Sequence, residues 1–425
     1  MPPKSFSETG EPLESITDGP YEVAGRALRW LFFAIGLPVG MLIPRLAEIK
    51  YGLGADNASY GTAIAIGGVG SFLGSWLGGK ATHRWGSRRV ARSGIVLILI
   101  ANVSNALAPT VLALAGIALL SGLSFSINNI AVNSQAVLIE QGLGRSYVPR
   151  AHAFWSLGTM SAGLVSSLIA PHTTPLQALC IGVLVSGAIY QSASGRLLTT
   201  EHEDRPEDDE SQLGRHEPIP RGALRFLAIL ALAQTIGLVA EMSVGDWSSV
   251  LLKQEFGIAV GPNGYGFTTF MLVQLVVRLL ATKLIDRFGM QAAIRACGLA
   301  GTIGYLASLG TAISTAQDGS THTLVLSCLS YAFLGLAVGP MPSAFTSAAG
   351  AIPGLPSARA LTITGLVVAA AGMIGRVAIA NLAELIPLTS VLLGMGLLVL
   401  VTVSMTFVLV PERAAQHAIQ REEQP

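Results

Sequence analysis

The sequence predicts an all-α membrane protein in which twelve transmembrane helices form two pseudo-symmetric halves of six helices each. Of its 425 residues, 51% are hydrophobic and only 12% are charged, whereas soluble domains carry roughly 25% charged residues. The charges collect in short patches between apolar stretches of ~20 residues, the length that a helix needs to cross ~30 Å of hydrocarbon. A soluble protein of this composition would precipitate, so the expected solvent is a lipid bilayer.

Twelve apolar segments account for most of the chain. We expect helices at 25–46, 58–79, 91–108, 110–139, 150–171, 174–195, 222–245, 262–283, 293–313, 322–347, 357–385 and 386–410. The predicted organisation is a tail at 1–24, an N-terminal half at 25–196, a linker at 197–221, a C-terminal half at 222–410 and a second tail at 411–425.

Prolines and glycines predict local features within three of these helices. Pro38 and Pro44 in the first segment, and Gly339-Pro340-Met341-Pro342 in the tenth, are expected to break the helical hydrogen-bond ladder. Gly70, Gly74 and Gly78 recur in the second segment at the spacing that lets two helix backbones approach closely. We therefore expect tight helix packing along this glycine face.

The linker between the halves contains an acidic run from Glu201 to Glu210. Nothing in it can form an apolar core, which predicts a disordered tether between the halves. A regulatory docking role is the alternative.

Lysine and arginine residues are distributed unevenly along the chain. If the N-terminus lies inside, the outer loops hold only Arg45, Lys50 and Lys253, while Arg278 and Arg376 lie within spans. The other 21 of the 26 basic residues then fall on the inner side or at inner helix ends. This asymmetry predicts that both termini are cytoplasmic, and we expect a cell-membrane protein of the bacterial inner membrane.

Two related basic segments, about 200 residues apart, indicate an internal duplication. Each follows the second apolar segment of its half, and the first carries five positive charges when Arg92 is counted. This charge predicts that the first segment is a short loop on one side of the membrane. The segments read Gly79-Lys80-Ala81-Thr82-His83-Arg84-Trp85-Gly86-Ser87-Arg88-Arg89 and Thr282-Lys283-Leu284-Ile285-Asp286-Arg287-Phe288-Gly289.

Both segments resemble the loop signature of the major facilitator superfamily, Gly-x-x-x-Asp-Arg-x-Gly-x-Arg-Arg, placed between the second and third helices. The resemblance implies the twelve-helix fold of that family, with one central site that opens alternately to either side. It also implies that the glycines permit a tight turn and that the loop acid caps a helix of the opposite half. The first segment departs from the signature with His83 in place of the acid, and the second with Thr282 in place of the opening glycine.

The same resemblance implies a latch that closes the cytoplasmic side. It pairs Asp286 with the start of the fifth helix, near Arg150 and His152, and His83 with the start of the eleventh helix, near Arg359. A histidine is a weaker cap than an acid, because its ring offers at most one acceptor and opposes the helix dipole when protonated. The residues expected in gating are Gly79, His83, Arg84, Gly86, Arg88, Arg89, Asp286, Arg287, Gly289, Arg150 and Arg359.

The fourth segment carries four amide side chains, at Asn128, Asn129, Asn133 and Gln135. At ~100° per residue they fall within an arc of about 160° on one helix. Hydrogen bonding between helices is the alternative role. Four amides in eight residues exceed what packing requires, so we expect them to line a substrate site.

The seventh segment places Gln234 and Glu241 on one helix face. A carboxyl group inside an apolar span is a candidate to carry protons during transport, and a static ion pair is the alternative. Arg278 and Arg376 are the arginines deep within spans, where each needs an acid, an amide or an anionic ligand. Structural pairing and substrate binding stand as equal alternatives for both arginines, and Gln234 joins them as a candidate substrate ligand.

A narrower resemblance is carried by Asp246-Trp247-Ser248-Ser249, by Asn129-Ile130-Ala131-Val132-Asn133 and by Leu42-Ile43-Pro44. These stretches are similar to the fucose-permease-related branch of the superfamily, whose members are often proton-coupled sugar carriers. Where fucose carriers have acids in the first and fourth spans, this chain has Gly40 and Asn129. The resemblance therefore implies a sugar-like substrate without implying the same proton sites.

We expect a monomeric secondary transporter that moves a small polar, sugar-like solute together with protons, without cofactor, metal or nucleic acid. The sequence has no Walker-type loop, His-Glu-x-x-His or Gly-x-Ser-x-Gly motif, which argues against an ATP-driven pump or an intramembrane hydrolase. Efflux of an amphipathic compound is one alternative. A transporter-like receptor or scaffold that no longer cycles is another, and His83 in the first loop favours it.

Overall fold

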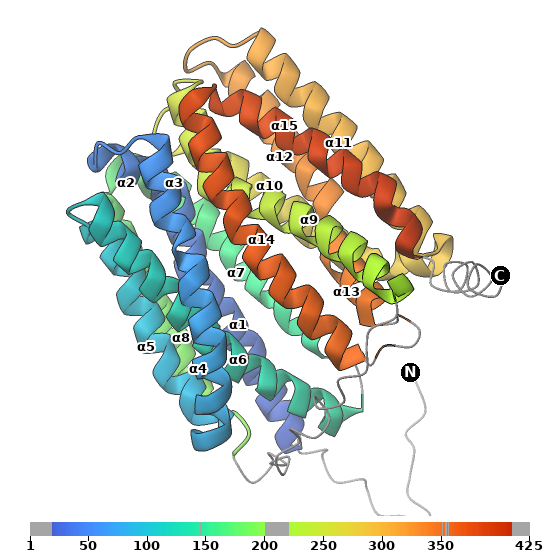
Figure 1. Ribbon diagram of the computed structural model, residues 1–425. Helices are drawn as coiled ribbons and strands as arrows, with labels where there is room; N and C mark the ends of the chain where they lie inside the picture. Colours follow the sequence, from blue (N-terminus) through green and yellow to red (C-terminus); the bar gives the residue numbers. More distant parts are fainter. Residues whose placement is uncertain are drawn as a thin grey trace, which may run out of the picture.

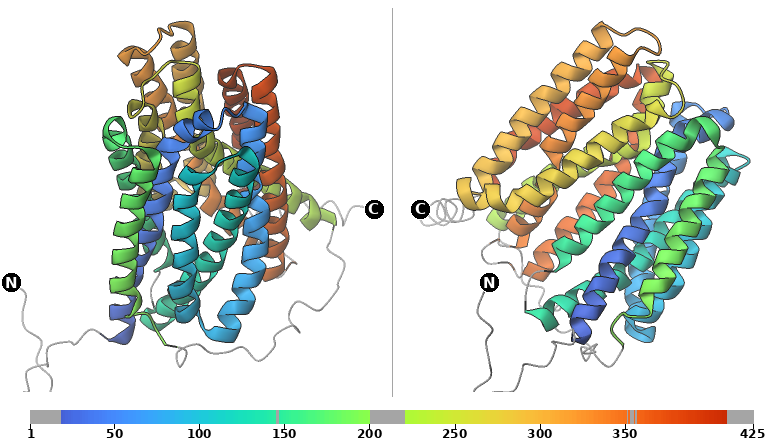
Figure 2. Two further views of the ribbon diagram at one scale, coloured as in Figure 1. Left: turned by 90° about the vertical axis from the view of Figure 1, so that its left-hand side faces the viewer. Right: turned by 180° about the vertical axis from the view of Figure 1, so that it is seen from behind.

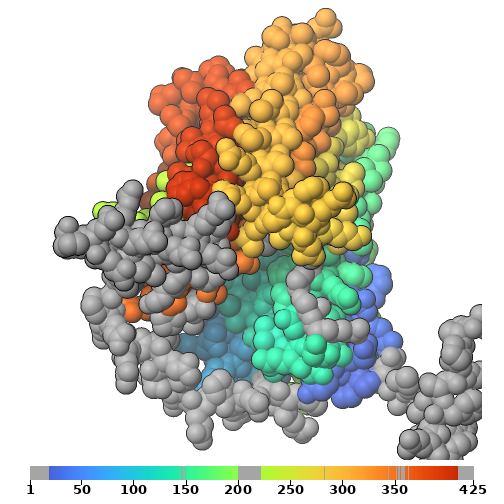
Figure 3. Space-filling view, turned by 90° about the vertical axis from the view of Figure 1, so that its right-hand side faces the viewer, coloured from blue at the N-terminus to red at the C-terminus, as the bar shows by residue number. Residues whose placement is uncertain are grey.

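The computed structural model describes residues 19–144, 147–199, 221–350, 352, 355 and 357–409. Within these ranges the chain is almost entirely helical, and twelve helices are long and apolar enough to cross a membrane. They form two groups that lie side by side (Figure 1). The same two groups form separate blocks on the surface, blue to green against yellow to red (Figure 3). The predicted fold class and number of spans are confirmed.

The first group, the N-terminal half, comprises α1 to α8. Its elements are α1 (Pro20–Leu42), η1 (Ile43–Arg45), α2 (Leu46–Gly52), α3 (Asn57–Ala65), α4 (Gly67–Trp85), α5 (Ser87–Ser104), η2 (Asn105–Leu107), α6 (Val111–Leu143), α7 (Val148–Ile169), η3 (Ala170–His172) and α8 (Pro175–Ser194).

The second group, the C-terminal half, comprises α9 to α15. Its elements are α9 (Arg221–Gln254), η6 (Pro262–Gly264), α10 (Tyr265–Phe288), α11 (Met290–Ser314), α12 (Thr321–Val338), α13 (Met341–Gly350), α14 (Ser357–Leu385), α15 (Leu388–Ser404) and η7 (Met405–Leu409). The acidic run of the predicted linker lies outside the described residues, as do 1–18 and 410–425.

The bundle has two ends, which we name by one residue each. At the Asn57 end lie α2 and the start of α3, and at the Gly86 end lie the turns at Gly86 and Gly289 (Figures 1 and 2). Because the helices alternate in direction, the described chain begins and ends at the Gly86 end.

The predicted loops at the two basic segments are wrong, because both segments are almost wholly helical. Helix α4 continues to Trp85 and α10 to Phe288, so each turn consists of one glycine. Gly86 has φ 83° and Gly289 has φ 81°, a left-handed conformation that only glycine adopts at little cost. No glycine or proline interrupts α4 between Gly79 and Gly86, and basic side chains are favourable in the last turn of a helix.

The prolines behave in two ways. The breaks expected at Pro44 and Pro340 are confirmed, since Pro44 lies in η1 and Pro340 separates α12 from α13. At Pro38 one hydrogen bond of the ladder is missing, as expected, but α1 itself passes through without interruption. Pro38 leaves the carbonyl of Ala34 without its usual intrahelical donor, and the Ser186 hydroxyl of α8 donates to that carbonyl instead, at 2.7 Å.

Glycines hold α4 against α6. Gly70, Gly74 and Gly78 are buried on one face of α4, and a methyl group added at any of them would approach the α6 backbone more closely than real side chains do. Gly122 of α6 makes the reciprocal contact against Gly67. The predicted close approach of two backbones is therefore present.

We expect Gly74→Ala to lower the thermal unfolding midpoint of the detergent-purified protein. The added methyl group forces two helix backbones apart, at a typical cost of about 1–3 kcal/mol. Gly116→Ala on α6 is the matched control, since nothing lies within 4 Å of its added carbon. That change should be neutral or stabilising by ~0.4–1 kcal/mol. Equal midpoints for the two variants would contradict this packing argument.

Candidate substrate site between the two halves

The two halves meet at the Asn57 end, where α3 packs against α14. A Glu384 carboxylate oxygen at the end of α14 accepts the backbone N–H of Asn57 at 2.9 Å and that of Ala58 at 3.4 Å. The Asn57 amide donates to the carbonyl of Ala383 at 2.8 Å. An acid of the C-terminal half thus caps the first turn of a helix in the N-terminal half, which is a favourable position for a negative charge.

The contact between the halves continues one turn deeper. The ring of Tyr60 packs edge-on against Trp247 of α9, with 5.6 Å between ring centroids. Gly61 packs so closely against Ala380 of α14 that a methyl group added at Gly61 would collide with it. Nearby, the Ser249 hydroxyl of α9 donates to the Ile43 carbonyl at 3.2 Å. These contacts close the Asn57 end.

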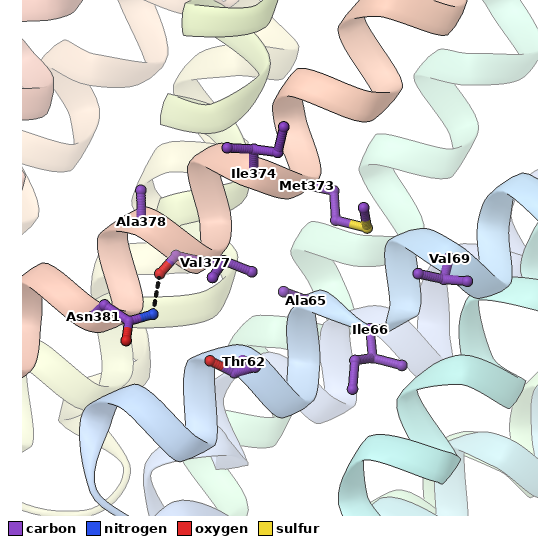
Figure 4. Close-up of a pocket in the computed structure, with 9 residues that line it drawn as sticks. All are labelled: Thr62, Ala65, Ile66, Val69, Met373, Ile374, Val377, Ala378 and Asn381. Atoms are coloured by element: carbon purple, nitrogen blue, oxygen red, sulfur yellow. Dashed lines mark hydrogen bonds between the residues drawn. The ribbon is translucent and has the colours of Figure 1, made fainter.

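An apolar hollow of about 340 Å³ lies between α3 and α14 (Figure 4). Val69 and Ile374 beside it are exposed. The Asn381 amide donates to the Val377 carbonyl of its own helix at 2.8 Å. A polar solute would therefore find few partners here. The hollow is lined by Thr62, Ala65, Ile66, Val69, Met373, Ile374, Val377, Ala378 and Asn381.

Arg376 of α14 is paired with Asp246 of α9. Two guanidinium nitrogens donate to the two carboxylate oxygens, each at 2.7 Å, and both side chains are only 13% exposed. This fork is the strongest geometry for such a pair. Of the two alternatives for Arg376, the structure shows structural pairing between two helices of one half.

Glu241 of α9 and Arg278 of α10 form a looser pair. The guanidinium donates to both carboxylate oxygens at 3.3 and 3.4 Å and to the Gly339 carbonyl at 3.3 Å. The side chain of Arg278 is 34% exposed and that of Glu241 is 23% exposed. Both charges therefore retain access to a solvent or a ligand, unlike the Asp246–Arg376 pair.

Three polar side chains of the N-terminal half form a series of contacts that ends near this pair. On α6, the Asn133 amide donates to the side-chain oxygen of Asn129 at 2.9 Å. On α7, the His152 ring nitrogen lies 3.2 Å from the Asn133 side-chain oxygen. His152 is exposed and interacts electrostatically with Arg278 across the two halves. We call Asn129, Asn133, His152, Glu241 and Arg278 the central cluster.

The other two amides of α6 point into the N-terminal half. The Asn128 amide donates to the Ala91 carbonyl at 2.8 Å and to the Tyr190 hydroxyl at 3.1 Å. The Gln135 amide donates to the Ser87 hydroxyl at 2.6 Å. Both side chains are fully buried. Their expected role in lining the substrate site is therefore wrong. The 160° arc on α6 is wide enough to face different neighbouring helices, and the edge of the arc that holds Asn128 and Gln135 faces α5 and α8.

Gln234 lies on α9, about two helical turns from Glu241. Its amide donates to the Thr346 hydroxyl of α13 at 2.6 Å, and the side chain is half-buried. It therefore lies on the side of the central cluster toward the Gly86 end.

The expected latch residues are open to solvent. Asp286 and His83 are exposed, and within the part of the chain that the structure describes neither forms a hydrogen bond or an ion pair. The guanidinium groups of Arg84 and Arg287 pack over the rings of the residues that follow them. The helix caps implied by the family resemblance are thus not formed in this conformation, which is closed at the Asn57 end.

The remaining residues expected in gating have varied surroundings. Arg88 donates to the Gly195 carbonyl at the end of α8, at 2.6 Å, where a positive charge is favourable. Gly79, Arg89 and Arg150 are exposed, and Arg359 is half-buried.

Two functional features were missed in the sequence. His152 was considered only as a neighbour of the latch, and the structure places it in the central cluster. The contact of Glu384 with the start of α3 was not anticipated. The available signals were a histidine inside an otherwise apolar span and an acid at the end of the eleventh span.

Known proteins with a similar sequence or a similar fold are membrane transporters. No family model matches the chain. An uncharacterized MFS-type transporter of Yersinia pestis is 28% identical over 381 residues, covering 88% of this chain and 93% of the relative. A single-residue variant of the nucleoside transporter NupG superposes with TM-score 0.73 at 15% identity, covering 91% of this chain and 100% of that one. A D-xylose-proton symporter superposes with TM-score 0.64 at 15% identity, covering 90% and 96%.

The chain is a multi-pass membrane protein with the fold of these transporters. Its relatives and structural neighbours are membrane transporters rather than enzymes, and together they support a transporter of the major facilitator type. They do not confirm the fucose-permease-related branch, which remains a resemblance.

We expect His83→Asp to increase the population that is closed at the Gly86 end and Asp286→Asn to decrease it. An acid at a helix N-terminus contributes about 0.3–1 kcal/mol, so each population ratio should change by about two- to fivefold. Distances between spin labels at Leu77 of α4 and Leu361 of α14, both exposed, measure the closure in a background with the three cysteines replaced.

His83→Gln is the matched control for this experiment, because it alters the side chain without adding a negative charge. Its distance distribution should equal that of the parent protein. If His83→Asp leaves the distribution unchanged or lengthens it, the latch argument is wrong.

Proposed function

We propose that this protein is a monomeric secondary transporter of the bacterial inner membrane that moves a small polar, sugar-like solute by alternating access. Both termini would lie in the cytoplasm, so that the Gly86 end faces inward. The observation that carries the proposal is the central cluster, to which both halves contribute polar side chains. With the Asn57 end closed, a solute would reach this cluster from the cytoplasm.

The central cluster offers the chemistry that a polyhydroxylated solute requires. Asn129 and Asn133 each provide donors and an acceptor, His152 provides a ring nitrogen, and Arg278 provides up to five N–H donors. A buried site built to bind hydroxyl groups discriminates strongly, because an analogue lacking them leaves these groups unpaired. Structural neighbours that are named as a nucleoside transporter and a D-xylose-proton symporter agree with a sugar-containing substrate.

Glu241 can couple proton binding to solute binding, because Glu241 and the solute would compete for the guanidinium group of Arg278. The Glu241–Arg278 distances of 3.3 and 3.4 Å exceed the 2.7–2.9 Å typical of charge-assisted hydrogen bonds. Protonation of Glu241 removes its negative charge and frees the guanidinium to bind the solute. Loss of the proton restores the pair and displaces the solute. Proton binding and solute binding thereby favour each other, as symport requires.

Solute flux into proteoliposomes tests this function. D-xylose and uridine serve as probes of sugar-like uptake under an imposed pH gradient, and ethidium serves as a probe of amphipathic efflux.

Efflux is the second candidate function, favoured by the apolar hollow between α3 and α14 that adjoins exposed Val69 and Ile374. Binding of a probe without any flux would instead favour the non-cycling receptor.

We expect Glu241→Gln to abolish accumulation driven by a pH gradient while sparing counterflow exchange, which needs no net proton movement. Glutamine keeps the size of the side chain and removes the titratable group. The same two assays on Asp246→Asn provide a control, because that acid is locked to Arg376 outside the central cluster. A Glu241→Gln variant that still concentrates solute on a pH gradient would rule out this carboxyl as the proton carrier.

We expect Asn133→Ala to weaken the apparent affinity for the transported solute by ~1–3 kcal/mol, because a solute hydroxyl loses its partner. Its thermal midpoint should remain near that of the parent protein. Asn128→Ala is the matched control on the same helix and should do the reverse, since its amide joins α6 to α5 and α8. Equal effects of both variants on affinity would contradict the assignment of Asn133 to the site.

A further inference from the structure

A separate hollow of about 520 Å³ lies between α1 and α8, near the Gly86 end. The two helices pack along each other at the outer side of the N-terminal half (Figure 2). Val23 and Ile189 contribute to its apolar wall, and Arg26, Arg196, Ser192 and Trp30 contribute its polar groups. None of these residues belongs to the central cluster or to the latch.

The hollow is positively charged. Arg26 lies in the second turn of α1 and Arg196 directly follows α8, so the two charges come from different helices. Both side chains are exposed, and the described residues that line the hollow include no acid, while Glu22 lies one turn before Arg26 outside the lining. The nearby Arg88 adds a third positive charge where it donates to the Gly195 carbonyl. This arrangement attracts an anion.

Trp30 gives the hollow a membrane-interface character. Its ring is 51% exposed, although it is held edge-on by Phe33 at 5.6 Å and by Phe154 at 6.0 Å. Tryptophan is enriched at the boundary between hydrocarbon and headgroups, where one side of the ring is apolar and the other is wet. Trp30 and the two arginines thus lie where a headgroup would be.

We propose that this hollow binds an anionic phospholipid, with the phosphate held by Arg26 and Arg196. Arginine donates two parallel hydrogen bonds to phosphate, which makes it well suited to this group. The apolar wall at Ile189, which lies deeper in the bundle than Arg196, receives the start of an acyl chain. Basic pockets between transmembrane helices bind anionic headgroups in this way. A freely soluble anion would not use the apolar wall or Trp30. The proposal requires only that the protein is embedded in a membrane, so it is independent of the transported substrate.

Native mass spectrometry of the purified protein tests the proposal, with phosphatidylglycerol and phosphatidylcholine as probes. We expect the parent protein to bind phosphatidylglycerol more tightly than phosphatidylcholine. The double variant Arg26→Gln, Arg196→Gln should lose about thirtyfold in affinity for phosphatidylglycerol, since each basic side chain near the surface contributes about fivefold. Its affinity for phosphatidylcholine should not change.

The double variant Arg225→Gln, Arg295→Gln is the matched control. It removes two exposed arginines near the Gly86 end of the C-terminal half, at the start of α9 and α11, and should retain phosphatidylglycerol binding. Arg196→Gln alone gives a second test if the first double variant folds poorly, because this residue lies beyond the end of α8. Its expected loss is about fivefold.

Three results would overturn the proposal. One is equal binding of phosphatidylglycerol by the parent protein and the Arg26, Arg196 variant. Another is equal affinity of the parent protein for the two lipids, which would show that only acyl chains are bound. The third is displacement of phosphatidylglycerol by millimolar inorganic phosphate, which would identify a site for a soluble anion.

Discussion

Two arginines lie at membrane depth, and the cost of leaving either one unpaired constrains how the C-terminal half packs. A charge at the bilayer centre costs at least ~2.5–3.5 kcal/mol, so each arginine needs an acid on a neighbouring helix. Arg376 is held by Asp246 in a closed fork at 2.7 Å, whereas Arg278 is held by Glu241 at 3.3 Å and remains partly exposed. The first pair joins two helices of the C-terminal half. In the proposed function, the second pair exchanges its partner for a solute.

A second electrostatic interaction, between an acid and a helix N-terminus, holds the two halves together. At the Asn57 end, Glu384 of one half accepts backbone N–H groups at the start of α3 in the other. The family resemblance implies the same device at the Gly86 end, where Asp286 would cap α7. Both closures then use an acid at a helix N-terminus across the interface between the halves. Such contacts can break and re-form without unfolding a helix, because the capped N–H groups face the interface.

Segment length and composition were sufficient to predict the twelve helices, because each span must supply ~20 apolar residues. The sequence could not reveal that α1 continues through Pro38. The hydroxyl of Ser186 that satisfies the freed Ala34 carbonyl lies 152 residues away in the chain. Helical periodicity was sufficient to place the four amides of α6 on one arc. It could not show which helices pack against each part of that arc. Asn128 joins α6 to α5 and α8, while Asn133 contacts His152 of α7.

Alternating access requires the two closures to be close in free energy. An acid cap contributes ~0.3–1 kcal/mol, and up to ~2 kcal/mol when partly buried. Replacement of one latch acid by His83 removes a contribution of this size from the Gly86 end only. We therefore expect the unequal latches to favour the conformation seen here, with Glu384 engaged and Asp286 exposed. In the proposed cycle, closing the Gly86 end would require about 1–2 kcal/mol from the solute, which one or two hydrogen bonds in the central cluster would supply.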